Sequence, residues 1–124
     1  MNEVDSGTKF RFQELDIWRR AVALGNELFD IAEDLETRKL YRFAEQLRAA
    51  GLSISNNIAE GSGSNSKEEF IQFLNIAKRS AFENANMILV FKTRGLISSD
   101  IARKVLCGLE EECKMITGFI RALK

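Results

Sequence analysis

The segment from Gln46 to Gly61 combines an apolar stripe with a polar row, and only a helix brings both into register. At about 3.6 residues per turn, the two sets of side chains run beside each other along one helix. The apolar stripe consists of Leu47, Ala50, Ile54, Ile58 and Gly61, and the polar row of Gln46, Ser53, Asn57 and Glu60. Polar side chains beside an apolar seam usually lie inside a bundle or an oligomer interface, where they satisfy one another. The segment therefore predicts a helix that packs against other helices.

The same spacing of apolar residues recurs along the chain and predicts four helices, over roughly 15–35, 40–60, 66–94 and 98–123. The sequence contains no proline, which fits long uninterrupted helices joined by short turns. Together these features predict an all-α fold, an antiparallel up-down-up-down four-helix bundle. We expect a polar N-terminal tail at residues 1–11 and a single domain at residues 12–124.

Local signals mark where the helices end. Ser66 followed by Glu69 is a capping-box pattern, and it predicts the start of the third helix. Gly95 predicts a left-handed stop at the end of that helix. The glycine and serine residues between 61 and 65 predict a loop. The candidates for the cap of the fourth helix are Ser98, Ser99 and Asp100.

Composition argues against several classes of protein. The chain has no histidine and no CxxC motif, so zinc sites and helix-borne di-iron sites are not expected, and no cofactor is predicted. Cys107 and Cys113 lie on one predicted helix about 9 Å apart, too far for a disulfide, and are expected to be reduced thiols. No apolar run approaches the roughly 18 residues of a membrane span, and the first residues lack the apolar core of a signal peptide. We expect a cytoplasmic protein without a membrane partner.

The polar side chains nearest the predicted core allow two interpretations. Glu60 and Glu83 could act as an acid and a base, but no nucleophile motif or phosphate loop accompanies them, so hydrogen-bonded structural carboxylates are favoured and no enzyme is predicted. Hydroxyl and amide groups of the row could bind a small ligand, but bonds that fix helix register are favoured. The predicted structural polar row consists of Gln46, Ser53, Asn57, Glu60, Ser80 and Glu83.

Charge is balanced overall but unevenly distributed. The chain has 18 basic and 18 acidic residues, which gives no general attraction to phosphate. Residues 1–36 carry a net charge of −5, whereas residues 37–95 carry +4. A basic face on the second and third helices could therefore contact nucleic acid, although an ordinary solvated surface is favoured. The possible nucleic-acid contacts are Arg42, Arg48, Lys78 and Arg79.

Two segments of the sequence carry a resemblance to a known family. FQELDIWRRAVAL at 12–24 and QLRAAGLSISNNIAEGSGSNSKEEFIQFLNIAKRSAFE at 46–83 resemble the bacterial four-helix-bundle proteins encoded in intervening sequences of 23S ribosomal RNA genes. That family is similar to the accessory variability protein of diversity-generating retroelements. The recurrent family positions are matched by Gln46, Arg48, Ser53, Asn57, Glu60, Gly61, Ser80 and Glu83. In two places the chain departs from the pattern: Ala49 replaces a second arginine, and Arg79 replaces the usual glycine.

The resemblance implies a homo-oligomeric ring, commonly a pentamer, without known enzymatic activity. It also implies that the retroelement relatives bind RNA and a reverse transcriptase through a basic surface. Two hypotheses follow. The chain is an interaction scaffold, in which leftover apolar residues such as Phe12, Trp18 and Phe82 contact other protomers or a partner protein. Alternatively, it is an RNA-binding module whose affinity falls steeply with salt.

Overall fold

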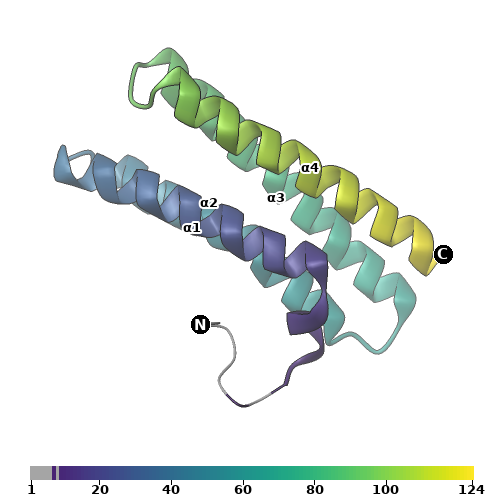
Figure 1. Cartoon of the computed structure of the whole chain (residues 1–124). Helices are drawn as coiled ribbons and strands as arrows, with labels where there is room; N and C mark the ends of the chain where they lie inside the picture. The colour runs from purple at the N-terminus through teal and green to yellow at the C-terminus, as the bar shows by residue number, and fades with distance from the viewer. Residues whose placement is uncertain (1–6, 8) are drawn as a thin grey trace.

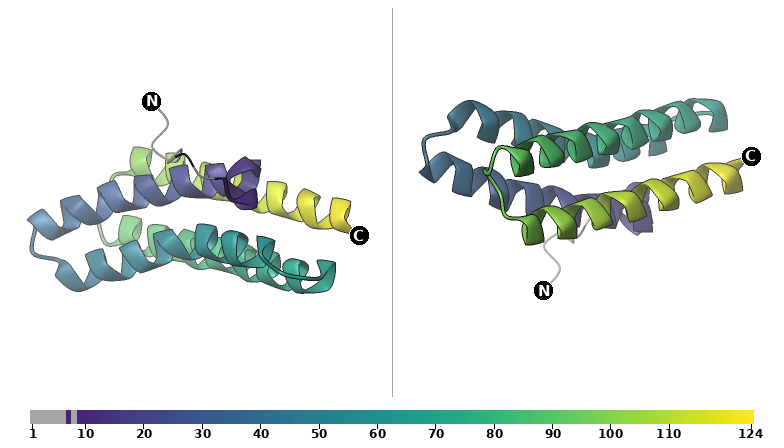
Figure 2. Two further views of the ribbon diagram at one scale, coloured as in Figure 1. Left: turned by 90° about the horizontal axis from the view of Figure 1, so that it is seen from below. Right: turned by 90° about the horizontal axis from the view of Figure 1, so that it is seen from above.

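The computed structural model describes residue 7 and residues 9–124, so most of the expected tail at 1–11 lies outside the described residues. A short 3-10 helix, η1, precedes four α-helices, and the described residues contain no strand. The elements are η1 (Arg11–Glu14), α1 (Asp16–Thr37), α2 (Tyr41–Ser62), α3 (Lys67–Thr93) and α4 (Ser99–Leu123). Consecutive helices run antiparallel and form two layers, α1 beside α4 and α2 beside α3 (Figures 1 and 2). The predicted all-α four-helix bundle is confirmed.

The residues predicted to cap the third and fourth helices accept hydrogen bonds at the helix starts. The hydroxyl of Ser66 accepts the backbone N–H of Glu69 at 3.1 Å, and that of Ser98 accepts the N–H of Ile101 at 3.1 Å. Among the three candidates for the fourth cap, the structure selects Ser98. The loop expected from residue 61 begins later, because α2 continues to Ser62.

Two helices end with the same left-handed turn. Gly95 has φ +73°, and the N–H of the next residue, Leu96, returns to the carbonyl of Phe91 at 2.9 Å. At the end of α1, Lys39 adopts φ +66°, and Leu40 donates to the carbonyl of Leu35 at 3.0 Å. The sequence predicts the first stop through its glycine but not the second, because lysine rarely adopts this conformation.

The core lies along the apolar stripes of all four helices. Every residue of the stripe from Leu47 to Gly61 is buried, as the helical spacing predicts. Trp18 is also buried, and its ring packs 5.1 Å from that of Phe12, so the expectation that Trp18 contacts a partner is wrong. Phe82 is 64% exposed, so contact with a partner through Phe82 stays a prediction. Contact between neighbouring helices is sparsest between α1 and α4.

Candidate functional site

The predicted polar row is only partly assembled within the protomer. The hydroxyls of Ser53 on α2 and Ser80 on α3 lie 2.7 Å apart and link the two helices. Asn57 donates to the carbonyl of Ser53 at 2.7 Å, within its own helix. The other three members of the row are exposed: Gln46, Glu60 and Glu83. The structure thus brings together three of the six predicted residues at the outer edge of the α2–α3 contact.

A stronger polar link between α2 and α3 lies deeper in the bundle, at a residue that was not predicted from the sequence. Asn84 is fully buried and donates to the carbonyls of Ala50, at 3.0 Å, and Ser80, at 2.6 Å. Its position continues the apolar stripe of α3, three residues after Ala81 and four before Ile88. An asparagine in an apolar stripe is the signal that could have identified it, because a buried amide needs partners.

Glu112 is the second polar residue in an apolar stripe. It is fully buried on α4, between Leu109 and Ile116. Burial raises the pKa of its carboxyl from 4.5 to about 8, opposed by the nearby Arg20 guanidinium of α1. The carboxyl is therefore mostly protonated at neutral pH.

Arg20, Asn84 and Glu112 form a polar layer across the bundle. Lys78 on α3 donates to Thr117 on α4 at 3.0 Å, and these helices are antiparallel, so Asn84 lies close to the level of Glu112. Within the described residues, the buried side-chain atoms without a hydrogen-bond partner are Arg20 Nε, Asn84 Oδ1 and both carboxylate oxygens of Glu112. All of them belong to this layer.

The four predicted nucleic-acid contacts do not share one face. Arg48 pairs with Glu36 of α1 at 3.1 Å, so it lies on the α1–α2 side. Lys78 donates to Thr117 and lies on the α3–α4 side. Arg42 and Arg79 are exposed on α2 and α3. Among the described residues, none of the four forms an ion pair with Glu45, Glu60 or Glu83.

Basic residues gather instead on the outer side of α3 and α4. Two shallow hollows on this side are lined by five cations and one carboxylate, Glu110. Exposed Phe82 lies among them. We call this surface the α3/α4 face; its cations are Lys78, Lys92, Arg103, Lys114 and Arg121. The sequence signal for the α4 half is the spacing of 11 and 7 residues between Arg103, Lys114 and Arg121, which places them on one side of a helix.

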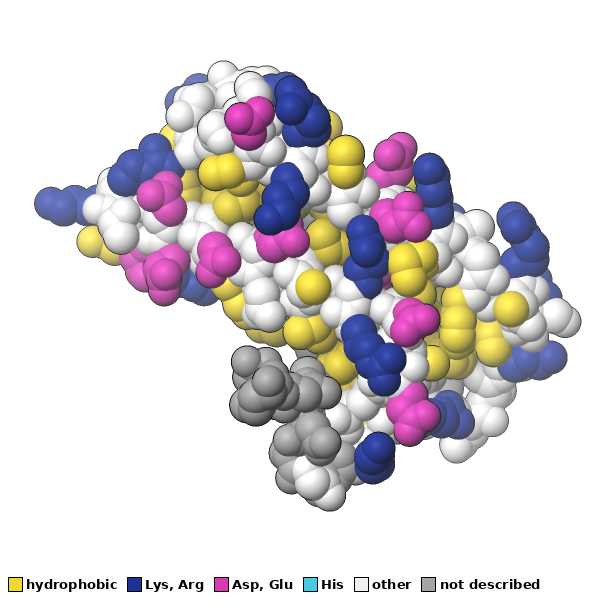
Figure 3. All heavy atoms as spheres, viewed as in Figure 1, with side chains coloured by type: hydrophobic (Ala, Val, Ile, Leu, Met, Phe, Trp, Pro, Cys, Tyr) yellow, Lys and Arg dark blue, Asp and Glu magenta, His cyan; other side chains and the backbone are white. Residues whose placement is uncertain are grey.

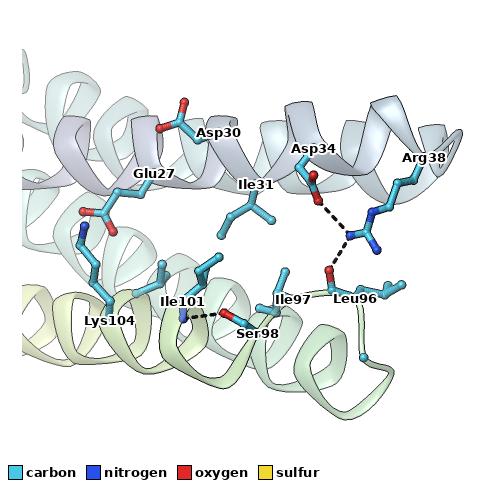
Figure 4. A pocket seen from close by; sticks show the side chains of 12 residues that line it. Glu27, Asp30, Ile31, Asp34, Arg38, Leu96, Ile97, Ser98, Ile101 and Lys104 are labelled. Carbon is cyan, nitrogen blue, oxygen red and sulfur yellow. Dashed lines mark hydrogen bonds and ion pairs between the residues drawn. The ribbon is translucent and has the colours of Figure 1, made fainter.

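The sparse contact between α1 and α4 leaves a groove of about 800 Å³ (Figure 4). Its apolar floor consists of Ile31, Leu96, Ile97, Ile101 and Val105. The α1 wall carries Glu27, Asp30 and Asp34. Arg38 closes one end, pairing with Asp34 at 3.0 Å and donating to the carbonyl of Leu96. The cleft between the same helices continues as far as Arg20 of the polar layer. We call this whole cleft the α1/α4 groove.

Other kinds of site find little support in the described part of the chain. No group of three or more Cys, Asp or Glu side chains there could hold a metal ion. Cys107 and Cys113 are free thiols, the first exposed and the second half-buried. None of the helices described is long and apolar enough to cross a membrane.

The sequence pattern of the family described as 23S rRNA-intervening sequence protein matches residues 13–118. The chain belongs to this family. A search of curated proteins gave no match. The match to the 23S rRNA-intervening sequence proteins includes the whole polar layer and every cation of the α3/α4 face except Arg121. The match confirms the resemblance to this family that the sequence shows.

Proposed function

We propose that this 23S rRNA-intervening sequence protein is a non-enzymatic scaffold that assembles into a homo-oligomeric ring, with five protomers as the resemblance implies. The observation that carries the proposal is a pair of exposed apolar side chains on α3, Phe82 (64% exposed) and Leu89 (47% exposed). The two residues are about two helical turns apart and therefore lie on the same side of the helix. Large apolar side chains grouped at the surface among polar neighbours are typical of protein interfaces. Neither Phe82 nor Leu89 belongs to the hydrophobic core or packs against it, so the packing of the protomer does not depend on them.

The arrangement of ionisable groups supports a role without catalysis. Among the described carboxyls, that of Glu112 is the one with a strongly raised pKa, and both of its oxygens are fully buried, out of reach of a substrate in solvent. A general acid needs a substrate atom within hydrogen-bond reach. The polar layer instead resembles the buried polar groups that fix helix register.

Native mass spectrometry of the purified chain and of Phe82→Ser tests the scaffold. We expect the unmodified chain at a multiple of its 14.0 kDa mass, and a lower oligomer order for Phe82→Ser at the same concentration. Helicity by circular dichroism should be equal in the two, because Phe82 is exposed in the protomer. A single-protomer mass for the unmodified chain at tens of micromolar would overturn the proposal.

RNA binding is the second candidate, and the α3/α4 face favours it. Five cations surround one carboxylate, and exposed Phe82 offers a ring on which a base can stack. Of the four contacts predicted from sequence, only Lys78 lies on this face. The test is filter binding of single-stranded RNA at rising salt, with the variant Lys114→Glu/Arg121→Glu against Arg42→Glu/Arg79→Glu. If RNA binds through this face, the first variant should lose affinity for RNA and the affinity of the second should change little.

A further inference from the structure

We propose that protomers associate head to tail, with the α3/α4 face of one copy seated in the α1/α4 groove of the next. This inference rests on the proposed ring and identifies its two contacting surfaces. The groove has carboxylates on its α1 wall and the face carries mainly cations, so their charges are complementary. Both surfaces also expose apolar side chains. The occupant of the groove is therefore a second copy of this chain.

The groove has an acidic wall. Its α1 side carries three carboxylates, those of Glu27, Asp30 and Asp34. The cations that line the groove are Arg38, Lys104 and, at its far end, Arg20. Negative charge near the C-terminal end of a helix is unfavourable, because the helix dipole already places partial negative charge there. A cation from outside would relieve this repulsion.

The protomer neutralises only part of the wall. Asp34 pairs with Arg38 at one end of the groove. In Figure 4 the side chain of Lys104 points toward Glu27. Asp30 makes no ion pair with any described residue. Figure 3 shows acidic side chains gathered along this half of α1, with apolar side chains between α1 and α4.

The α3/α4 face has the opposite character. Lys92, Lys114 and Arg121 make no ion pair with any described residue, so they are available to a partner. Phe82 and Leu89 add apolar area, and the groove offers Ile101, itself 46% exposed. Apolar contact at the centre with opposite charges at the rim is the usual anatomy of a specific protein interface.

The placement of the two surfaces selects the symmetry. Both include α4 and adjoin at Cys107, but the groove opens toward α1 and the face toward α3. An isologous dimer through the groove would bring two acidic walls together, and one through the face would bring two basic surfaces together. A heterologous contact avoids both and repeats from copy to copy until it closes into a ring.

Charge reversal with restoration tests this contact. The groove variant is Asp30→Lys/Asp34→Lys, the face variant is Lys114→Glu/Arg121→Glu, and the third protein carries all four substitutions. All four positions are exposed, so the fold should be retained and is checked by circular dichroism. Sedimentation velocity over a dilution series gives the dissociation constant of the assembly.

We expect each variant to weaken assembly about tenfold or more, and the protein with all four substitutions to recover most of the loss. The matched controls are Glu60→Lys and Arg42→Glu, exposed charge reversals on α2 outside both surfaces, and they should assemble normally. The uncharged variant Ile101→Ser should also weaken assembly.

The outcomes separate this inference from the proposed function. If the unmodified chain forms a ring but the groove and face variants assemble as well as it does, the scaffold stands and this contact is wrong. Loss in both variants without recovery in the combined protein also overturns the contact, because the two surfaces then do not face each other. An unmodified chain that is monomeric overturns both proposals.

Discussion

Gly25 of α1 and Gly51 of α2 bring the backbones of their helices into contact. A Cβ atom built on Gly25 would lie 2.7 Å from the carbonyl oxygen of Gly51, closer than real Cβ atoms approach. The obstacle is backbone rather than a flexible side chain, so it cannot move aside without separating the helices. Both glycines lie inside helices, where glycine is otherwise unfavourable. Close packing of α1 on α2 is therefore the reason for their presence.

Gly25→Ala should destabilise the protein despite the higher helix propensity of alanine. We expect a loss of about 1–3 kcal/mol in the free energy of unfolding, the usual cost of overpacking. Urea denaturation followed by circular dichroism measures it at a fixed protein concentration. Gly118→Ala is the matched control, because a Cβ on Gly118 in α4 meets nothing within 4 Å. It should stabilise by about 0.5–1 kcal/mol, and equal effects of the two substitutions would contradict the close contact.

Glu112 should make the protein less stable as the pH rises. Its pKa is about 8 in the folded chain against an ordinary 4.5, so between these values the folded state binds more protons than the unfolded state. The free energy of unfolding then falls by about 1.4 kcal/mol per pH unit through this window, a total on the order of 3–5 kcal/mol. Urea denaturation at pH 5, 6.5 and 8 measures the trend.

Glu112→Gln separates this carboxyl from other titrating groups. The amide has nearly the same shape and no charge at any pH, so the variant should lose the decline and exceed the unmodified chain in stability at pH 8. Glu111→Gln is the control, since Glu111 is exposed and adjacent in sequence. If the unmodified chain is equally stable from pH 5 to 8, Glu112 is not protonated inside the bundle.

Asn84 should matter more to stability than Asn57. The amide of Asn84 is fully buried and bridges α3 to the Ala50 carbonyl of α2, whereas Asn57 donates within its own helix. Asn84→Ala leaves a buried carbonyl without its partner and should cost about 1–3 kcal/mol. Asn57→Ala should cost less than about 1 kcal/mol. Urea denaturation of both variants gives the comparison, and a larger loss at Asn57 would contradict the assignment.

The fold and the helix ends were predictable because their determinants are local. The stripe from Leu47 to Gly61 repeats at the helical period, and burial follows directly from that period. Ser66 and Gly95 act on residues within a turn of themselves. Lys39 shows the limit of such signals, because the tertiary fold imposes a left-handed turn on a residue that does not favour it.

The candidate sites were harder to predict because they depend on the register between helices. The α3/α4 face joins Lys78 to Arg121, which are distant in sequence and become neighbours only when α3 and α4 pack. Charge counted along the chain allowed a basic face on α2 and α3 instead, but Arg48 and Lys78 lie on different sides. Asn84 and Glu112 were missed because each interrupts an apolar stripe by a single residue.

RNA binding and ring assembly should compete, because both proposals use the cations of the α3/α4 face. Adding a polyuridine oligonucleotide at low salt to the assembled protein should release protomers that carry RNA, as native mass spectrometry would show. Raising the salt should reverse this, since contacts to phosphate are lost as counterions compete. A ring that binds RNA without losing protomers would show that Lys114 and Arg121 remain accessible in the assembly. The face would then be an RNA site, and the ring contact would have to lie elsewhere on the bundle.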